Sequence, residues 1–296
     1  MSRKAKHKGK TAVEQPEPQR DATPLVSVVM GVYNQLDREA LHQAVDSILN
    51  QTFTDLELII YNDGSVPEAS QYIDTLKSRD PRIRITGSTE NRGLAFSLNV
   101  CIGLARGSYI ARMDADDISA PDRLQAQVDY LETHPEVSWC GSNAFLFDED
   151  GIWGTRVMPE RPTKEDYLRF SPFIHPSVMY RRELFHKACG YLEKEEVLHC
   201  EDYEIFMRLE EMGLVGVNIQ EYLFHYRENL DSYRRRTFRN RFNEAKLRYR
   251  SFSEMHMLFP KGWLYVLRPI VGGLLPTSLI RRIKKMQAKS IRETHT

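Results

Sequence analysis

The sequence has few cysteines, and none stands in a metal-binding spacing. Its 296 residues include four cysteines, and no two of them form a CxxC pair. Small secreted domains need a dense disulfide framework, and zinc sites need closely spaced thiols. We therefore expect reduced thiols in a cytoplasmic protein, with neither a disulfide framework nor a zinc site.

Long apolar runs are also missing. A membrane-spanning helix needs about 20 consecutive apolar residues. The nearest candidate, residues 263–275, is interrupted by Arg268, Pro269, Gly272 and Gly273. The opening MSRKAKHKGK lacks the apolar stretch of a secretory signal. The sequence predicts a protein that is neither exported nor membrane-spanning, and that lies at the inner face of the cytoplasmic membrane as a peripheral protein.

Basic and acidic residues balance over the whole chain, but not within its parts. The formal net charge is +0, yet residues 1–20 carry 6 basic and 2 acidic side chains, residues 21–233 carry 19 and 36, and residues 234–296 carry 16 and 3. The basic ends indicate an anionic partner, either nucleic acid or a lipid surface, unless they are solvated charge. The acidic body argues against nucleic acid as the main substrate.

The order of sequence patterns predicts an α/β fold. Residues 1–23 are polar and basic and include two prolines, which is typical of a disordered arm. Short β-branched runs at 25–32, 56–61, 82–86 and 108–112 then alternate with amphipathic helical patterns. This alternation predicts a Rossmann-like, mainly parallel sheet with helices on both faces and a ligand at the carboxyl ends of the strands.

Three segments follow the arm. We expect one half of an α/β domain at 24–140, the other half of the same domain at 141–233, and a basic amphipathic extension at 234–296. In the second half, the patterns predict strands at 144–147 and 175–180, a loop through Gly151 and Gly154, a helix at 201–212, and one or two strands at 215–226.

The acidic run RMDADD, residues 112–117, carries the most specific chemistry. It follows a predicted strand and precedes a predicted helix. Clustered carboxylates repel one another unless a cation neutralises them, and oxygen ligands suit Mg²⁺ or Mn²⁺ bound together with a phosphate group. The run predicts a metal-diphosphate site. The alternative is an exposed acidic turn that caps the next helix.

Two further strand ends lie at the same predicted edge. The first strand ends in Val32, Tyr33 and Asn34, and the second ends in YNDGS, which includes Asp63. Asp63 could accept hydrogen bonds from a base or a ribose, although Asn-Asp-Gly is also an ordinary turn sequence. With the acidic run, three loops then stand where a nucleotide would lie.

Four linked stretches lie between residue 24 and about 141: VSVVMGVYN, LNQTFTDLELIIYNDGS, ENRGLAFSLNVCIGLARGSYIARMDADD and PDRLQAQVDYLETHPEV. Through them the chain resembles the family 2 inverting glycosyltransferases, which have the GT-A fold. The resemblance implies that 24–140 is the nucleotide-sugar-binding half and 141–233 the acceptor-binding half. It implies that Asp63 contacts the base, that Arg92 and Gly93 lie near the nucleotide, and that Asp114 and Asp116 serve the diphosphate and the metal. The expected donor-binding residues are Val32, Tyr33, Asn34, Asp63, Arg92, Gly93, Arg112, Asp114, Ala115, Asp116, His175 and Arg227.

The second half resembles the acceptor side of the same family. HPSVMYRRELF begins at His175, and CEDYEIFMRL contains Glu201 and Asp202. An inverting transfer needs a carboxylate that takes the acceptor hydroxyl proton. We assign this role to Asp202, with Glu201 in reserve; without the resemblance the pair is simply an acidic helix start. His175 is either a donor-sugar contact or a packed histidine.

One motif departs from the family. Many relatives carry Tyr-Arg-x-His after the last strand, whereas this chain reads Tyr226-Arg227-Glu228-Asn229. A histidine ligand at that place is therefore in doubt, while Arg227 could still pair with a diphosphate.

The basic extension ends in a predicted amphipathic helix. Ser278 could cap it, with Leu279, Ile283 and Met286 on one face and basic side chains on the other. This composition is typical of a helix on an anionic membrane surface. A helix docked on the acidic body, or on the second subunit of a homodimer, is the alternative.

The whole sequence thus predicts a metal-dependent enzyme of cell-surface glycan biosynthesis, such as polysaccharide or lipopolysaccharide. It would transfer sugar from a nucleotide sugar, with UDP expected, to a saccharide or lipid-linked saccharide. A nucleotidyltransferase would need glycines after the first strand, where this chain has Tyr33-Asn34-Gln35-Leu36. A non-catalytic nucleotide-binding scaffold is the other alternative.

Overall fold

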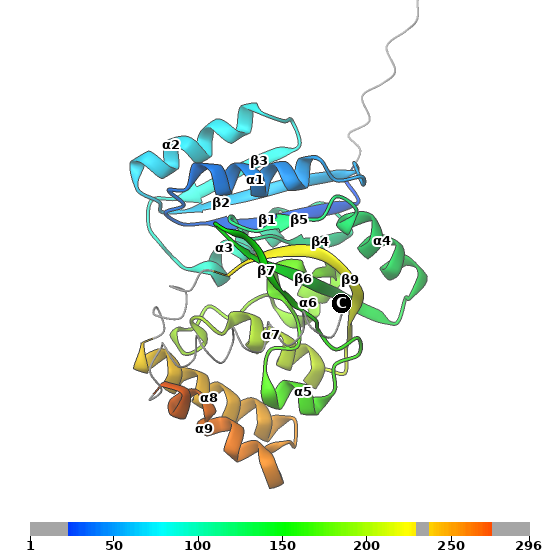
Figure 1. Ribbon diagram of the computed structural model, residues 1–296, viewed down its shortest axis with the longest axis vertical. Helices are drawn as coiled ribbons and strands as arrows, with labels where there is room; N and C mark the ends of the chain where they lie inside the picture. Colours follow the sequence, from blue (N-terminus) through cyan, green and yellow to red (C-terminus); the bar gives the residue numbers. More distant parts are fainter. Residues whose placement is uncertain (1–22, 229–236, 274–296) are drawn as a thin grey trace, which may run out of the picture.

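The computed structural model describes residues 23–228 and 237–273. One mixed sheet organises these residues, with helices packed around it (Figure 1). In spatial order its strands are β3 (Ile83–Ser88), β2 (Leu56–Asp63), β1 (Val26–Val32), β4 (Tyr109–Arg112), β8 (Met179–Arg181), β6 (Val137–Asp148), β9 (Val215–Arg227) and β5 (Ile118–Ser119), with β7 (Gly151–Arg156) paired to β6.

The sheet is parallel in its first half and mixed in its second. The neighbours β3, β2, β1 and β4 all pair in parallel. Strand β8 then pairs antiparallel with both β4 and β6, β9 runs parallel to β6, and β5 closes the order antiparallel to β9. The predicted α/β fold is confirmed, and the parallel half places the carboxyl ends of β1, β2 and β4 at one edge.

Helices cover both faces of the sheet, as predicted. Side chains alternate between the two faces along a strand, and here apolar side chains on both faces need cover. In β1, Val28 and Met30 belong to one apolar cluster and Val29 belongs to the other. Helices α1 (Arg38–Leu49), α2 (Pro67–Thr75) and α4 (Arg123–Thr133) contribute to the first cluster, while α3 (Leu94–Leu104), α6 (Glu183–Ala188) and α7 (Glu201–Glu211) contribute to the second. The remaining short helices of the body are η1 (Leu76–Ser78), α5 (Lys164–Arg169), η2 (His175–Ser177) and η3 (Glu195–Val197).

Two predicted segments of the second half are corrected. The strand expected at 175–180 begins only at Met179, because residues 175–177 form the 3-10 turn η2 around Pro176, whose ring has no N–H to give a sheet. The loop expected near Gly151 and Gly154 contains the strand β7, which pairs with β6 as a hairpin. Its sequence offers no clear apolar alternation.

The C-terminal helices pack against the body. Helix α8 (Phe238–Glu254) buries Leu247 and Phe252 in the second cluster, and Arg248 Nη1 donates to the Leu168 carbonyl oxygen at 3.0 Å. The turn η5 (Leu258–Gly262) leads into α9 (Trp263–Gly273), which lies beside α8 (Figure 1). The helix predicted from Ser278 lies outside the described residues.

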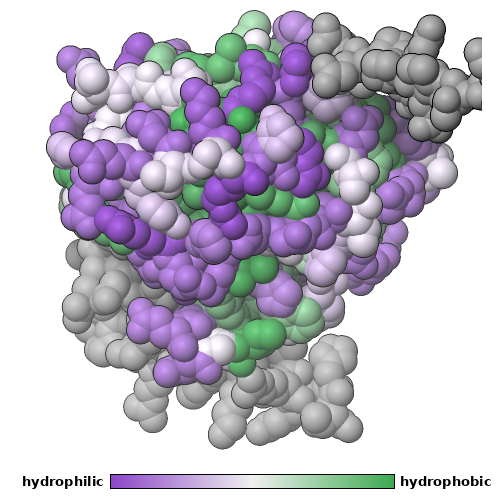
Figure 2. Space-filling view, turned by 90° about the horizontal axis from the view of Figure 1, so that it is seen from above, coloured by the Kyte–Doolittle hydropathy of each residue, from purple (hydrophilic) through white to green (hydrophobic). Residues whose placement is uncertain are grey.

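The surface differs from one end of the molecule to the other. Figure 2 looks down on the end that carries α1 and α2, and mostly hydrophilic side chains cover it. Several large apolar side chains of α8 and α9 are exposed instead. None of the helices within residues 23–228 and 237–273 combines the length and the apolar character needed to cross a membrane.

Candidate active site

Three carboxylates gather in the turn that follows β4. The strand ends at Arg112, and the turn leads into the short strand β5. Ligand oxygens of Asp114, Asp116 and Asp117 all lie within 4.8 Å of one another. Ala115, between them, packs against the first apolar cluster and so anchors the turn. The acidic run is therefore one compact group of oxygens at the carboxyl end of a central strand.

Two arginines hold this turn in place. The buried Arg112 has its Nη1 2.5 Å from Asp114 Oδ2. In β9, Arg227 donates from its backbone N–H to Asp117 Oδ1 at 2.7 Å and from Nε to the Asp116 carbonyl oxygen at 2.8 Å. The contacts of Arg227 tie the turn to the second half of the sheet.

The charge of the cluster is only partly balanced. Burial and the charge of Asp114 raise the pKa of Asp116 to about 6. The same causes, together with the charge of Asp116, raise the pKa of Asp117. Asp117 Oδ2 is buried and has no hydrogen-bond partner in the described part of the chain. Because an unpaired buried oxygen is costly and these are hard ligands, the residues fit a divalent cation.

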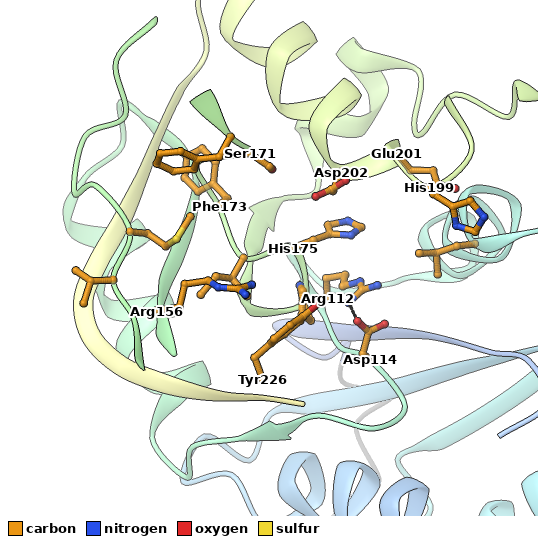
Figure 3. A pocket seen from close by; sticks show the side chains of 16 residues that line it. Arg112, Asp114, Arg156, Ser171, Phe173, His175, His199, Glu201, Asp202 and Tyr226 are labelled. Carbon is orange, nitrogen blue, oxygen red and sulfur yellow. Dashed lines mark ion pairs between the residues drawn. The ribbon is translucent and has the colours of Figure 1, made fainter. Parts of the chain in front are cut away.

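A cavity of about 680 Å³ opens beside the acidic turn. Figure 3 shows Arg112 and Asp114 on one side of it and Glu201 and Asp202, from the first turn of α7, on the other. Glu201 is buried, which raises its pKa, whereas Asp202 is only partly buried. Carboxylates from two distant parts of the sequence, the acidic turn and the start of α7, therefore line the same cavity.

His175 also lines the cavity. Its ring is buried, and Nε2 lies 2.8 Å from the Tyr191 hydroxyl. Burial and the nearby charge of Arg112 lower its pKa well below the ordinary value. The His175 ring is thus a packed side chain that also lines the cavity, and its contact with a donor sugar stays a prediction.

Asp63 heads a second cluster, at the ends of β1 and β2. Its carboxylate accepts from the backbone N–H groups of Arg92 and Gly93, each at 2.8 Å, and from Asn91 Nδ2 at 2.9 Å. Gly93 has a φ of +90° and immediately precedes α3, so Asp63 fixes the start of that helix. Base contact by Asp63 stays a prediction.

Asn34 joins the loops of this second cluster. Its backbone N–H donates to Ser65 Oγ at 3.0 Å, and its Oδ1 accepts from the Val66 N–H at 2.8 Å. Val32 is buried beneath it and Tyr33 is exposed. None of the residues of this cluster lines the 680 Å³ cavity, although Leu94, at the start of α3, reaches it.

Sequence reasoning missed several residues of the site. Arg156 and Tyr226 line the cavity from β7 and β9, and Phe173 lines it from the segment before η2. The sequence pattern gives no signal for Arg156, because it predicts a loop where the structure has β7. The buried Arg123 was missed as well: its Nη2 donates to the Arg112 carbonyl oxygen at 2.7 Å and supports the acidic turn from α4.

Known structures share this architecture. A mannosyltransferase from Pyrobaculum calidifontis, solved in complex with GDP-Man and Mn²⁺, aligns with a TM-score of 0.58 at 17% identity over 90% of this chain and 81% of its own. S. aureus TarS 1–349, in complex with UDP-GlcNAc, aligns with a TM-score of 0.61 at 15% identity over 82% and 72%. The likeness shows the GT-A fold of glycosyltransferases.

Sequence comparison gives the family. Glycosyltransferase EpsE of Bacillus subtilis is 32% identical over 91% of this chain and 96% of its own length, and the amylovoran biosynthesis glycosyltransferase AmsE of Erwinia amylovora is 28% identical over 90% and 100%. Residues 27–188 match glycosyl transferase family 2. The chain belongs to this family and is a glycosyltransferase.

Proposed function

We propose that the protein is an inverting, metal-dependent glycosyltransferase of cell-surface polysaccharide biosynthesis. It would use a nucleoside-diphosphate sugar, with UDP as the expected nucleotide, and a saccharide or lipid-linked saccharide acceptor. The observation that carries the proposal is the placement of Asp114 and Asp202 on opposite sides of one cavity. The names of AmsE and of the O-antigen biosynthesis glycosyltransferase WbnJ support the class of product.

Asp202 acts as the general base in this proposal. Its carboxylate takes the proton of the acceptor hydroxyl while that oxygen bonds to the anomeric carbon, and the bond from that carbon to the diphosphate oxygen breaks on the opposite face. Glu201 serves this role less well, because burial raises its pKa and disfavours the carboxylate form. The sugar thus leaves the nucleotide with inversion at the anomeric carbon.

The acidic turn and the arginines serve the nucleotide diphosphate. Asp116 and Asp114 would hold Mn²⁺ or Mg²⁺, and a bound divalent cation supplies neutralisation of the charge that develops on the departing diphosphate. Arg112, whose buried guanidinium is paired with Asp114, would orient a phosphate oxygen. Arg227 keeps the acidic turn in register with β9.

A donor panel tests this proposal. Release of nucleotide diphosphate would be measured with Mn²⁺, several nucleotide sugars and a membrane-lipid acceptor extract. We expect Asp202→Asn to lower turnover by about 10²- to 10⁴-fold while the protein stays folded, because general-base help is lost. Asp129→Asn, on the exposed side of α4, is the matched control. Unchanged turnover in Asp202→Asn would remove Asp202 from the base role.

We further propose that α9 lies on an anionic membrane surface. Leu264, Leu267 and Val271 recur at helical spacing and are exposed, and Trp263 is exposed beside them. Lys261 and Arg268 flank this apolar stripe, and residues 234–296 as a whole are strongly basic. Apolar and aromatic side chains combined with basic ones are what an anionic lipid surface attracts.

Liposome sedimentation separates this proposal from a protein partner. We expect Leu267→Glu to lower binding of the full chain to anionic vesicles severalfold, since the charge opposes insertion of the stripe. Met212→Glu, which alters an exposed apolar residue at the end of α7, should bind as the wild type does. Equal binding of both variants and the wild type would exclude α9 as the membrane face.

A further inference from the structure

Three polar rings form a buried chain behind the cavity. His175 Nε2 lies 2.8 Å from the Tyr191 hydroxyl, and that hydroxyl lies 3.4 Å from the hydroxyl of Tyr180. Both tyrosines and His175 are buried. This chain of three side chains runs from Tyr180 in β8, through Tyr191 after α6, to His175 in η2. Of the three, His175 alone lines the cavity.

Tyr191 has a fixed position in this chain. Its backbone N–H donates to Asn99 Oδ1 at 2.8 Å, and its carbonyl oxygen accepts from Asn99 Nδ2 at 2.9 Å, so one side chain of α3 clamps both backbone groups. The preceding Gly190 has a φ of +72°, and a Cβ there would come within 2.5 Å of Asn99 Oδ1. The backbone that carries Tyr191 is therefore tightly held.

All three groups are neutral at neutral pH. Burial and the charge of Arg112 lower the pKa of His175. Burial raises the pKa of Tyr191 to about 12 and also raises that of Tyr180. A neutral imidazole has one N–H donor and one acceptor nitrogen, and each phenol has a single hydrogen to donate. The two hydrogen bonds can therefore be arranged in three ways: both pointing from His175 toward Tyr180, both pointing from Tyr180 toward His175, or both donated to the Tyr191 oxygen.

The end of the chain at Tyr180 selects one direction. If His175 Nε2 donated to Tyr191, one buried phenol hydrogen would have no acceptor within the described residues: that of Tyr180 if Tyr191 donated to it, or that of Tyr191 if it accepted from both neighbours. If Tyr180 donates to Tyr191, and Tyr191 donates to Nε2, both phenol hydrogens are used. Because a buried donor without an acceptor is costly, the arrangement in which Tyr180 donates to Tyr191 and Tyr191 donates to Nε2 is favoured. The imidazole hydrogen then stands on Nδ1.

We propose that Tyr180 and Tyr191 act as positioning residues that hold His175 in its Nδ1–H form, and that this N–H donates to a hydroxyl group of the sugar bound in the cavity. His175 Nδ1 has no hydrogen-bond partner among residues 23–228 and 237–273. In the view of Figure 3 the His175 ring stands between Arg112 and Asp202, where a sugar between diphosphate and base would lie. The sugar contact rests on the proposed function; the form of the ring does not.

The form of the ring can be read without any substrate. Long-range ¹H–¹⁵N spectra of the full chain labelled with ¹⁵N-histidine distinguish Nδ1–H from Nε2–H, and loss of one signal set in His175→Asn assigns His175. We expect Nδ1–H in the wild type and a shift toward Nε2–H in Tyr191→Phe. Tyr203→Phe, which loses a buried hydroxyl that donates to the Tyr167 carbonyl oxygen, should leave the signals unchanged. Nε2–H in the wild type would overturn the proposal.

Matched substitutions test the sugar contact. The amide of Asn can place an N–H where Nδ1–H stands, whereas the amide of Gln reaches the place of Nε2. With the best donor of the panel, we expect His175→Gln to lower kcat/KM about tenfold, mainly through KM, and His175→Asn to retain most of it. A purely structural role would lower the amount of active enzyme and leave KM unchanged. Equal KM values in the wild type and both variants would contradict the contact.

The two proposals fail in different ways. If no donor is turned over, the proposed function fails, while the ¹⁵N spectra still report the direction of the hydrogen-bond chain. If Asp202→Asn abolishes transfer but His175→Gln leaves the donor KM unchanged, the function stands and the role of His175 is wrong.

Discussion

Asp63 and the acidic turn at residues 114–117 lie at the same edge of the sheet, yet their carboxylates have very different surroundings. Asp63 is 3% exposed and accepts three hydrogen bonds from Asn91, Arg92 and Gly93. In the turn, three carboxylates crowd within 4.8 Å, and Asp117 Oδ2 is buried without a partner in the described structure.

We infer from this difference that the Asp63 carboxylate stabilises the fold and that the acidic turn binds a cation. The Asp63 carboxylate accepts hydrogen bonds from N–H donors that are already in place in the folded chain, so these hydrogen bonds contribute to the fold. The acidic turn instead has raised pKa values, caused by burial and like charge, which means that its charges oppose folding until a cation balances them. The comparison therefore predicts that the two sites respond oppositely to substitution.

The largest effect should come from the acidic turn and should appear in activity. We expect Asp116→Ala to lower the rate of sugar transfer on the order of 10³-fold, because cation binding supplies several kcal/mol of charge stabilisation. Its melting temperature without metal should equal or exceed that of the wild type, since one repelling charge is gone. Transfer assays measure the rate, and thermal melts measure the stability. A large loss of stability in Asp116→Ala would show that Asp116 stabilises the fold, as we expect of Asp63.

Asp63→Ala should show the reverse pattern. Removal of the carboxylate leaves the backbone N–H groups of Arg92 and Gly93 without their acceptor, while the Asn91 amide keeps the Asp63 carbonyl oxygen as a second acceptor, so we expect the free energy of unfolding to fall by about 2–4 kcal/mol. Urea denaturation of the metal-free protein measures it. If Asp63→Ala unfolded at the same urea concentration as the wild type, the structural role of the carboxylate would be refuted.

Glu57 provides a third carboxylate that extends the comparison. Burial raises its pKa, but hydrogen bonds from the Arg106 N–H, Ser27 and the side chains of Arg84 and Arg106 outweigh burial, and the net pKa lies below the ordinary 4.5. A lowered pKa in the folded state means stability that is present above pH 4.5 and lost as the pH falls through the folded value.

Glu57→Gln should therefore be less stable than the wild type by about 1–3 kcal/mol at neutral pH, with a difference that shrinks below pH ~4. Melting temperatures across an acid series measure the difference. A constant difference from pH 7 to pH 3 would show that the charge of Glu57 contributes nothing.

The parallel half of the fold was predictable, because its strands are short, β-branched and separated by amphipathic helices. The acidic turn was predictable for the same reason, since a polar run directly after a buried strand must lie at the sheet edge. The second half was less so. Pro176 shortens a predicted strand, and β7 has exposed and polar residues that hide its pairing with β6.

The sequence indicates which types of residue line the cavity, but not which residues contact one another there. Asp202 and Arg112 could be proposed from their motifs, whereas Arg156 and Tyr191 could not. Their roles depend on contacts between segments far apart in the chain: Tyr191 meets Asn99 of α3 and His175 of η2. No local pattern encodes such contacts.

Thermal melting with UDP, with and without Mn²⁺, tests most directly whether the acidic turn is a cation site. At about ten times its dissociation constant, Mn²⁺ should stabilise the wild type by about 1.4 kcal/mol, which corresponds to roughly 3–6 °C. The account predicts this shift in the wild type and its loss in Asp116→Ala. An equal shift in both proteins, or no shift in the wild type, would contradict it.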